Sequence, residues 1–548
     1  MKKTTLLLAF TCALIYTADA QQDTGLSAQF DKIIEEQFPL EETGVTVLVS
    51  SRGKIIYKKA FGLANAELNV PIQADNVFRI ASITKQFTAV AILQLMEQGK
   101  LDLQDEITRF IPDYPTRGNK ITIEHLLTHT SGITDYSALR DTLRSQGDLT
   151  PVQMINIFKN LPMQFAPGTK WEYSNSGYFL LGYIIEKITG KTYGQYLEDH
   201  IFKPLGMEQS QYASDTKLIP KRASGYTTGE NGFENAPYLS MTHPYAAGSI
   251  QSTVEDIFKW QQAVLSYKPV KKESLDKAFT RYRLADGKQT AYGYGWRIGN
   301  VYKSPSLWHG GLIAGYTSMA IYLPKEDVFV AVFSNCDCSS PEVATNRIAA
   351  LAAGRAYEHK EMLVANKILQ GYTGVYENEK GQQRIITMGE NKLFSQLGRG
   401  PKSLIRSYEK DKFFYDADAM ATIAFERIKS GTVKELKTVN LRGIDIWIKT
   451  NKSIPDENGI KVAEQILKTY TGIYEVSPDF AFSVSNEQGR LFLQATGQEK
   501  LEMFAETPTT FFLKVNDAQL EFVKDDSGKV TKAILKQGGR ETDARKIK

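Results

Sequence analysis

Ser82 and Lys85 are the two residues whose types and spacing most directly suggest chemistry. Residues three apart share one face of a helix, so the lysine amine could remove the proton of the serine hydroxyl. The free N–H groups and positive dipole at a helix start favour the negative charge that develops when an acyl group is attacked. A half-buried Lys85 would have its charged form disfavoured, so it could act as the base. The apolar residues that predict this buried helix are Phe87, Ala91, Ile92, Leu95 and Met96.

The Ser-x-x-Lys pattern is weak when it stands alone, since about two chance matches are expected in a chain of this length. Other matches include those at Ser51, Ser214 and Ser274. The Ser51 copy is predicted to be a hairpin turn, and the other two lie in short polar stretches that no buried helix follows. Ser82 is therefore the candidate nucleophile, and the rest of the chain must supply its partners.

Tyr173 and Asn175 lie on a predicted loop that enters a helix, where side chains can face a cleft. Pro167-Gly168 predicts a turn before them, and the apolar run 178–185 predicts the helix after them. A simpler interpretation makes Tyr173 an aromatic anchor of the loop and Asn175 a helix cap. The local sequence leaves both interpretations open.

His309-Gly310-Gly311 lies within a region that begins and ends with predicted strands. A hairpin is expected around the Arg52-Gly53 turn, and two strands followed by a helix from Pro341 to about Tyr357 are expected at the other end. The same order at both ends predicts one antiparallel sheet built from both ends of the region. The predicted strands span residues 46–50, 55–61, 318–323 and 328–333.

Residues 1–20 have the composition of a secretory signal peptide. Lys2-Lys3 precedes an apolar run at 6–16, and the small residues of Ala18-Asp19-Ala20 follow it. The run is too short for a permanent membrane span, although an uncleaved anchor or lipidation at Cys12 remains an alternative. No other segment of the sequence reaches membrane-spanning length. The sequence therefore predicts an exported protein, periplasmic or secreted, with no membrane span after cleavage.

The charge balance argues against a nucleic-acid partner. The formal net charge is +4, and residues 1–20 hold two lysines and one aspartate, so their removal leaves about +3. Lysine and arginine are spread along the chain without the dense stripe that nucleic-acid binding requires. The length of 548 residues is sufficient for two or three hydrophobic cores.

We expect neither a metal nor a cofactor. Cys336 and Cys338 are two positions apart, a spacing that rarely closes an unstrained disulfide, so ordinary thiols at a strand end are expected. No second cluster of cysteine or histidine completes a metal site. His125 and His129 are four apart on a predicted helix, but no glutamate follows His125 as in the zincin metalloproteases. These histidines are expected to pack and to cap.

Three motifs together give the sequence a resemblance to a known family. Ser82-x-x-Lys85, Tyr173-x-Asn175 and His309-Gly310-Gly311 occur in the order and approximate spacing of the serine β-lactamase-related hydrolases. This group includes class C β-lactamases, D-Ala-D-Ala carboxypeptidases, D-aminopeptidases and esterases. The stretches 126–132 and 204–207 are also typical of it, and the resemblance covers roughly residues 25–360. It implies an α+β fold with a β-lactamase/transpeptidase-like antiparallel sheet flanked by helices. No Gly-x-Ser-x-Gly elbow is present, which disfavours an α/β-hydrolase.

The resemblance implies a role for each motif residue. Ser82 would be the acylated nucleophile and Lys85 its partner base. Tyr173 would move protons between Ser82, the leaving group and the incoming water. Asn175 would hydrogen-bond the acyl-side amide of the substrate. The oxyanion hole would consist of the backbone N–H groups of Ser82 and Leu312.

The third motif departs from the β-lactamase pattern. The resemblance places His309 where β-lactamases have the lysine of Lys-Thr-Gly, and Gly310 and Leu312 supply no hydroxyl for a substrate carboxylate. Gly311 would let the strand approach the substrate closely. The charge of a histidine depends on pH, and burial beside Lys85 would favour the neutral ring. We therefore expect amide, aminopeptidase-like or ester substrates rather than β-lactams or peptides ending in D-Ala.

The remainder of the chain contains an internal repeat. Tyr-Thr-Gly-Val-Tyr-Glu at 372–377 recurs as Tyr-Thr-Gly-Ile-Tyr-Glu at 470–475, and short alternating segments follow each copy. This spacing predicts one small antiparallel β-barrel per copy. The barrels resemble the lipocalin-like C-terminal barrels of D-aminopeptidases, and a structural or a ligand-binding role stays open. The predicted parts are a signal peptide (1–20), a hydrolase domain (21–365) and two barrels (366–455 and 456–548).

The sequence thus predicts an exported serine hydrolase that forms an acyl-enzyme through Ser82. Its substrate would be a small molecule or peptide, such as a D-amino-acid-containing or cell-wall-derived amide, or an ester. A D-Ala-D-Ala carboxypeptidase or a β-lactamase is the competing enzyme. A catalytically weak penicillin-binding sensor or scaffold is the alternative from another class, and the intact set of Ser82, Lys85 and Tyr173 argues against it. The sequence does not indicate the oligomeric state.

Overall fold

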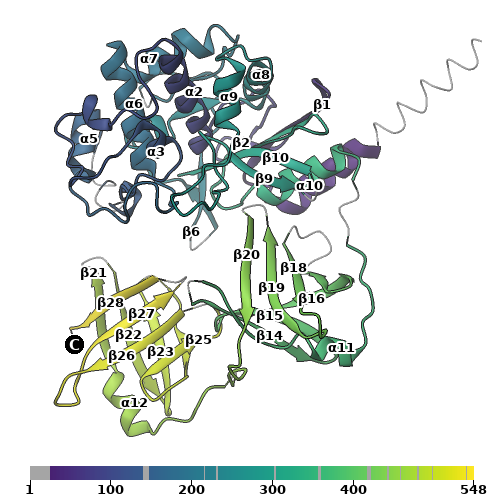
Figure 1. The fold of residues 1–548 in the computed structure, drawn as a ribbon, viewed down its shortest axis with the longest axis vertical. Coiled ribbons are helices and arrows are strands. Elements are labelled where there is room, and N and C mark those ends of the chain that lie inside the picture. The colour runs from purple at the N-terminus through teal and green to yellow at the C-terminus, as the bar shows by residue number, and fades with distance from the viewer. Residues whose placement is uncertain are drawn as a thin grey trace, which may run out of the picture. The chain divides into compact units, whose positions relative to one another are not determined.

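The computed structural model describes residues 25–547 apart from short gaps. The predicted signal peptide, residues 1–20, lies outside the described residues. The chain divides into two compact units after residue 357 (Figure 1). The gaps are residues 140–142, 144–146, 215, 230–231, 302–303, 356–358, 380, 416–420, 441–442, 457, 478–479, 497, 517 and 538–539.

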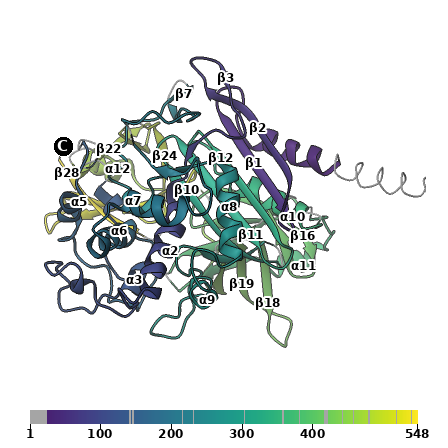
Figure 2. The ribbon, with the colours of Figure 1, turned by 90° about the horizontal axis from the view of Figure 1, so that it is seen from above.

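A seven-stranded antiparallel sheet is the framework of the first unit, in the order β3-β2-β1-β12-β11-β10-β9. Strand β1 lies between β2 and β12, so strands from the two ends of the unit pair directly (Figure 2). This confirms the sheet predicted from both ends of the region. The strands are β1 (Gly44–Ser51), β2 (Lys54–Asn65), β3 (Val70–Pro71), β9 (Arg297–Val301), β10 (Ser304–Ile313), β11 (Tyr316–Leu323) and β12 (Val328–Ser334).

Helices cover this sheet and surround α2, the helix that carries Lys85. Helices α8 and α10 both pack against β12, and α2 packs against α6. The Phe87 ring stacks on Trp260 with centroids 4.3 Å apart, and Trp260 stacks on Trp296. This buried aromatic column joins α2 to α8 and fixes the position of Lys85. The helices are α2 (Thr84–Glu97), α3 (Ile123–Leu127), α5 (Pro151–Phe158), α6 (Asn175–Thr189), α7 (Tyr193–Leu197), α8 (Val254–Leu265), α9 (Lys272–Ala278) and α10 (Glu342–Ala352).

A small three-stranded sheet, β4-β8-β5, leads the chain into the turn that holds Ser82. The Ile80 N–H donates to the Ile250 carbonyl at 3.0 Å, and the Ile250 N–H donates to Thr84 Oγ1 at 3.1 Å. The residues on either side of Ser82 are therefore fixed by the same strand. The smaller strands are β4 (Phe78–Arg79), β5 (Gln211–Tyr212), β8 (Ile250–Ser252) and the hairpin of β6 (Tyr226–Gly229) and β7 (Gly232–Asn235).

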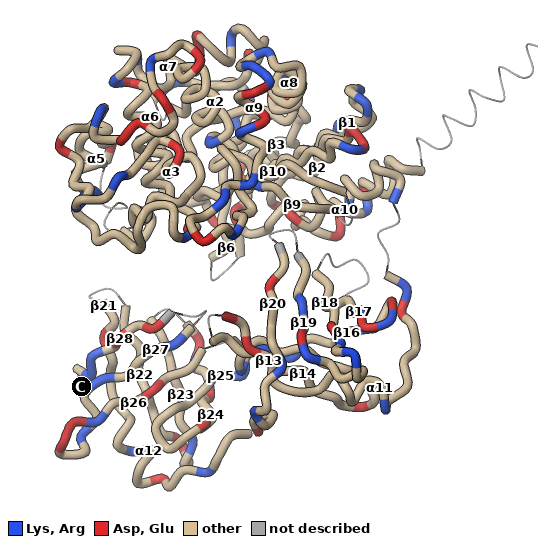
Figure 3. The backbone as a smooth tube through the Cα atoms, in the orientation of Figure 1, with Lys and Arg blue, Asp and Glu red and all other residues tan. Residues whose placement is uncertain are grey.

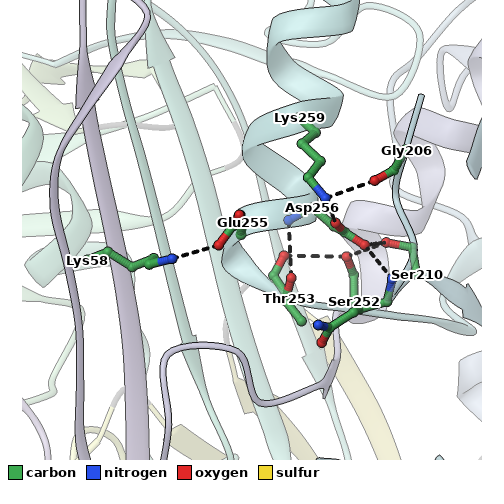
Figure 4. A network of polar contacts seen from close by, with 9 residues as sticks. Lys58, Gly206, Ser210, Ser252, Thr253, Glu255, Asp256 and Lys259 are labelled. Carbon is green, nitrogen blue, oxygen red and sulfur yellow. Dashed lines mark hydrogen bonds and ion pairs between the residues drawn. The ribbon is translucent and has the colours of Figure 1, made fainter.

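A buried polar network holds the start of α8 directly after β8 (Figure 4). The Asp256 carboxylate accepts hydrogen bonds from Gln209 N at 2.8 Å, Ser210 Oγ at 3.0 Å and Lys259 Nζ at 2.8 Å. Thr253 caps the helix by accepting the Asp256 N–H at 3.1 Å. Burying this carboxylate is tolerated because each of its contacts is a donor. The network thereby stabilises the strand that supports the Ser82 turn.

The end of β12 corrects one expectation from the sequence. Cys336 and Cys338, expected to be free thiols, form a disulfide bond, and their Cα atoms are 5.2 Å apart. A strand-like path would place alternate Cα atoms about 6.7 Å apart, near the upper limit for a disulfide. The chain turns after β12 instead, which brings the two residues into the ordinary range. The expectation is wrong because it assumed that the strand continued.

The second unit consists of two closed antiparallel barrels, as the internal repeat predicts. In each barrel consecutive strands pair, and the last strand pairs with the first. A short helix precedes each one, α11 (Asn366–Gln370) or α12 (Glu464–Tyr470). The first barrel contains β13 (Gly374–Glu377), β14 (Gln383–Gly389), β15 (Lys392–Leu397), β16 (Lys402–Glu409), β17 (Lys412–Phe414), β18 (Thr422–Arg427), β19 (Val433–Asn440) and β20 (Gly443–Lys449). The second contains β21 (Gly472–Ser477), β22 (Phe480–Glu487), β23 (Arg490–Ala495), β24 (Leu501–Ala505), β25 (Thr510–Leu513), β26 (Ala518–Lys524), β27 (Val530–Gln537) and β28 (Arg540–Lys546).

The repeated Tyr-Thr-Gly-x-Tyr motif makes the same contact in both barrels. The Tyr376 hydroxyl donates to the Tyr372 carbonyl at 2.7 Å, and the Tyr474 hydroxyl donates to the Tyr470 carbonyl at 2.7 Å. Each bond ties the first strand of a barrel to the end of its preceding helix, and all four rings are buried. The sequence repeat is therefore a structural repeat. The exact boundaries at residues 365 and 455 stay predictions.

Charged residues of both signs are interspersed along the described parts of each unit (Figure 3). Among the described residues, no helix combines the length and the apolar character needed to cross a bilayer. The same residues contain no group of three or more histidine, cysteine, aspartate or glutamate side chains placed to hold a metal ion.

Candidate active site

Ser82 lies in a short 3-10 turn, η1 (Ala81–Ile83), that runs directly into α2. The prediction that Ser82 stands at the start of a buried helix is confirmed, with this tighter turn preceding the α-helix. Ala81 has a φ of 46°, a left-handed conformation that costs a residue with a Cβ about 1 kcal/mol or more. This strained residue directly precedes Ser82, which is partly exposed.

Lys85 is completely buried, whereas the sequence suggested half-burial. Its Nζ lies 3.0 Å from Ser82 Oγ, 2.8 Å from Asn175 Oδ1 and 2.7 Å from the Ala247 carbonyl oxygen. All three contacts are to neutral groups, and within the described part of the chain no carboxylate forms an ion pair with this amine. A buried ammonium without such a partner is expensive, so the arrangement favours loss of its proton.

The pKa of Lys85 is lowered to about 7, chiefly because burial removes water from the ammonium. The charge of Asp135 raises this pKa, and that of Arg297 lowers it. A neutral amine has two N–H donors and one lone pair. It can donate to both oxygen acceptors and direct its lone pair at Ser82, whose hydroxyl then donates to it. Near neutral pH, a substantial fraction of Lys85 is therefore a base positioned at the serine.

Tyr173 lies beside the same amine. The Lys85 Nζ is 4.8 Å from the centre of the Tyr173 ring, and a hydrogen bond connects the phenol to Ser82. Burial raises the pKa of Tyr173 well above its usual range, although its hydrogen bond with Ser82 and the charge of Arg297 lower it in part. Tyr173 therefore keeps its proton where Lys85 has begun to lose its own. The structure brings the three predicted catalytic residues together. Of these, Lys85 is the group that can accept a proton and Tyr173 is the group that can donate one.

His129 packs against the Tyr173 ring, with centroids 4.3 Å apart. Its Nδ1 accepts the Ser174 N–H at 3.1 Å, so the neutral ring carries its proton on Nε2. Burial and nearby cations hold the pKa of His129 well below its usual range. His125 forms a capping box with Thr122 at the start of α3. The prediction that these histidines pack and cap is confirmed.

Asn175 is the first residue of α6, and its amide is engaged on both sides. Its Oδ1 accepts from Lys85 at 2.8 Å, and its Nδ2 donates to Asp135 at 3.0 Å. The alternative that Asn175 caps the helix is wrong, because Ser174 occupies that position. The orientation of the amide suits the amine of Lys85, and a contact with a substrate amide stays a prediction.

His309 is buried, and both of its ring nitrogens have partners. Nδ1 lies 2.7 Å from the Gly310 carbonyl, which can only accept, so Nδ1 carries the proton. Nε2 lies 2.9 Å from the Tyr292 hydroxyl and accepts from it. Burial and the charges of Arg297 and Lys85 hold the pKa of His309 well below its usual range. The ring is neutral, as the sequence analysis expected, and its contact with substrate stays a prediction.

Gly311 permits a close approach of β10 to the Ser82 turn. A Cβ added at Gly311 would lie 2.4 Å from the Ile80 carbonyl oxygen and 2.9 Å from the Ala81 Cβ. The sequence analysis assigned the space to substrate, whereas the structure fills it with the protein's own backbone. The approach places Leu312, a residue that is 68% exposed, on the same pocket as Ser82. This placement supports the oxyanion hole predicted from the N–H groups of Ser82 and Leu312.

The pocket beside Ser82 has a volume of about 500 Å³. Ser82, Asn175 and Leu312 line it next to the reacting groups, and Tyr136 and Leu239 belong to its apolar walls. A pocket of this size accommodates a small acyl group beside an attacked carbonyl.

Comparison with known proteins assigns the chain to a family. A family model described as "Beta-lactamase" matches residues 30–355, which is more than half of the chain. The chain belongs to the β-lactamase family. A second model, described as a domain of unknown function (DUF3471), matches residues 456–546, the region of the second barrel.

Relatives of this β-lactamase-family chain include binding proteins and hydrolases. Penicillin-binding protein 4* of Bacillus subtilis (strain 168) is 27% identical over 524 residues, which cover 92% of this chain and 95% of the relative. The D-aminopeptidase of Gluconobacter oxydans (strain 621H) is 27% identical over 323 residues, 58% of this chain and 60% of the relative. A structure of D-amino acid amidase from Ochrobactrum anthropi SV3 matches with a TM-score of 0.54 and 25% identity, covering 60% of this chain and 97% of that one.

Arg297 is a member of this β-lactamase-family site that sequence reasoning missed. Its guanidinium carbon lies 5.4 Å from the centre of the Tyr173 ring and 5.3 Å from that of Trp308. The register of β9 and β10 places it opposite Trp308, the neighbour of His309. No carboxylate pairs with it among the described residues. The site therefore contains a cation near the position where replacement of lysine by histidine had suggested none.

Proposed function

We propose that this β-lactamase-family protein is a serine hydrolase that forms an acyl-enzyme through Ser82. The proposal rests on the opposite pKa shifts of Lys85 and Tyr173, the two groups that contact the Ser82 hydroxyl. Burial lowers the pKa of Lys85 to about 7 and raises that of Tyr173, so one is a base while the other is still an acid. Two groups whose pKa values differ in this way are suited to general acid–base catalysis near neutral pH.

In the proposed acylation step, the neutral Lys85 amine takes the proton of Ser82 as Oγ attacks the substrate carbonyl. The oxyanion forms near the backbone N–H groups of Ser82 and Leu312. Tyr173 donates its proton to the leaving amine or alcohol, the bond from the carbonyl carbon to that group breaks, and Lys85 returns a proton to Tyr173. In deacylation, Lys85 or Tyr173 takes a proton from water, and Ser82 recovers its hydrogen when the ester bond breaks.

We propose an amide, a D-amino-acid-containing peptide or an ester as substrate. The similarity to a D-aminopeptidase and a D-amino acid amidase supports this class. The neutral, fully engaged ring of His309 supports it further, because the ring offers no charge to a substrate carboxylate. We also propose that the protein acts outside the cytoplasm, which rests on the composition of residues 1–20.

A second candidate function is cleavage of a substrate that carries a carboxylate, as in a D-Ala-D-Ala carboxypeptidase or a β-lactamase. The observation that favours it is Arg297, whose guanidinium lies beside Tyr173 without a carboxylate partner among the described residues. This cation could compensate for the lysine that His309 replaces. The candidate ranks second because Arg297 does not line the pocket beside Ser82.

The test is labelling with a fluorophosphonate and with benzylpenicillin, followed by mass spectrometry of the modified residue. The fluorophosphonate is expected to label Ser82 stoichiometrically, and Ser82→Ala should lose both labelling and hydrolysis while remaining folded. Ser214→Ala, at another Ser-x-x-Lys match, is the matched control and should retain both. Stoichiometric labelling of another serine would overturn the proposal. Efficient penicillin turnover would favour the second candidate, and penicillin labelling without any turnover would favour a sensor or scaffold.

A further inference from the structure

The pocket beside Ser82 contains one acidic group that the acyl-enzyme mechanism does not use. Asp337 lines this pocket together with Ser82 and Leu312. No lysine or arginine is among the described residues that line it. A carboxylate on a pocket wall that is otherwise largely apolar favours a cation in the space before it.

The Asp337 carboxylate is held in a fixed place. The disulfide between Cys336 and Cys338 spans it. Its backbone N–H donates to the Tyr226 carbonyl at 3.1 Å, which ties it to β6. Its Oδ2 accepts the Gly315 N–H at 2.9 Å, in the turn between β10 and β11. A carboxylate held at three points loses little conformational entropy when a ligand binds. Its attraction for the ligand is therefore offset by little entropy loss.

The second oxygen of this carboxylate, Oδ1, has no hydrogen-bond partner among the described residues. The turn that Asp337 anchors continues the strand of Leu312, and residues 312–314 line the same pocket. A carbonyl held between Ser82 and Leu312 would therefore have the substituents of its α-carbon in the space that Asp337 borders. An ammonium group there could donate to Oδ1.

We propose that Asp337 is a specificity-determining residue that receives an ammonium group on the acyl side of the substrate. The inference rests on the proposed function of Ser82, and it narrows the substrate class to compounds with a free amino group near the reacting carbonyl. The apolar walls at Tyr136 and Leu239 would contact the rest of the acyl group. The Cys336–Cys338 bridge has the role of keeping the carboxylate at the pocket wall.

The test compares two fluorophosphonates of equal chain length, one ending in an ammonium group and one in a methyl group. Each probe transfers its phosphonyl group to Ser82 and releases fluoride, so the second-order rate of labelling is measurable without knowing the natural substrate. The native protein should react faster with the ammonium probe. Asp337→Asn preserves an acceptor for Gly315 and should lower the ratio of the two rates about 10-fold, equivalent to about 1.4 kcal/mol. The rate with the methyl probe should change little.

Glu234→Gln is the matched control, because it removes a negative charge from β7 without altering the lining of the pocket. It should leave the ratio of rates unchanged. A ratio that is the same in native protein and Asp337→Asn would overturn the inference and leave Asp337 as an anchor of the turn alone. If neither probe labels Ser82 in the folded protein, the proposed function itself fails. Charge reversal in Asp337→Lys should slow the ammonium probe further, and an unchanged ratio in this variant would also contradict the inference.

Discussion

Two buried cations, Lys85 in the first unit and Arg399 in the second, have opposite surroundings. Arg399 donates to the Glu506 carboxylate at 2.9 Å and to the Asp456 carbonyl at 2.9 Å, and its guanidinium lies over the Phe512 ring. Lys85 contacts a hydroxyl, an amide oxygen and a backbone carbonyl. The charge in the barrels is matched by an opposite charge, whereas the charge beside Ser82 is not.

This difference separates a structural cation from a candidate catalytic base. A carboxylate partner stabilises the charged form, so Arg399 joins the two barrels as a permanent ion pair. Neutral acceptors satisfy the hydrogen bonds of Lys85 without stabilising its charge, so burial moves its pKa to about 7. A pKa lowered mainly by burial beside a pocket, with no carboxylate paired to the amine among the described residues, is the pattern expected of a catalytic base.

The largest effect is expected for Lys85→Met, which removes the amine and keeps the volume of the side chain. The value of kcat/KM for an ester or amide substrate should fall about 10²–10⁴-fold, the range for loss of a positioned general base. Near-native turnover in this variant would show that the base lies elsewhere. Because the native Lys85 must be buried in charged form at low pH, the variant should also unfold at higher temperature.

That gain in stability should itself depend on pH. The folded-state pKa of about 7 lies below the unfolded value of 10.5, so the penalty for burying the charge is fully present below pH 7. It disappears as pH rises from about 7 toward 10.5. Thermal unfolding at pH 6 and pH 9.5 should therefore show a larger advantage of Lys85→Met at pH 6. An equal advantage at both values would contradict the depressed pKa.

The next largest effect is expected in the native protein when the pH is changed. The value of kcat/KM should rise with pH through the pKa of Lys85, which is about 7. The rate should increase about 10-fold per unit below this value and level off above it. A neutral His309 predicts that activity persists to alkaline pH. A catalytically required imidazolium would instead make activity fall as pH rises through about 6.5, the unperturbed value for histidine. The profile of ester hydrolysis from pH 5 to 9 distinguishes the two.

A smaller change is expected for Asp135→Asn. The Asp135 charge raises the pKa of Lys85, so its removal should move the rising limb of the pH profile to lower pH. The plateau of activity should change little, because the new asparagine keeps an oxygen that can accept from the Asn175 amide. A limb that moves to higher pH would show that Asp135 does not stabilise the charged amine. Ser82 labelling by a fluorophosphonate at each pH provides an independent measure.

The smallest effect on activity is expected for Arg399→Met, the counterpart of Lys85→Met in the barrels. The folded second unit should be destabilised by about 1–2 kcal/mol, because Glu506 loses its cationic partner while remaining partly hydrated. Calorimetry of the full-length protein measures this transition. Unchanged kcat/KM is expected, and a large loss of activity would mean that the barrels take part in catalysis.

The sequence located the candidate catalytic residues because each lies in a short local motif. Ser82 and Lys85 share one turn of helix, and Tyr173 follows a recognisable turn and precedes an apolar helix. Each local pattern is weak alone, and the three motifs in order identified the set. The repeat predicted both barrels for the same reason. The strand patterns at the two ends of the first unit predicted that both ends share one antiparallel sheet, although they did not predict the order of its strands.

Residues whose role depends on the register of distant strands or on the path of loops were missed. Arg297 reaches the site because β9 pairs with β10 at Trp308, and no local pattern encodes that register. The Ala247 carbonyl meets Lys85 because a loop turns at that point. The disulfide at Cys336 was misjudged for a related reason, since the turn after β12 is not visible in the residue types.

The close contact at Gly311 limits how this enzyme could be altered by mutation. A side chain there would meet the Ile80 backbone oxygen at 2.4 Å, and backbone cannot rotate away as a side chain can. A Cβ at Gly310 would meet only the Met319 sulfur at 3.3 Å and the Ser318 carbonyl at 3.4 Å, and Leu312 is exposed. Directed evolution of this strand is therefore expected to accept changes at positions 310 and 312 and to reject nearly all at 311. New specificities would be reached through the two positions that flank this close contact.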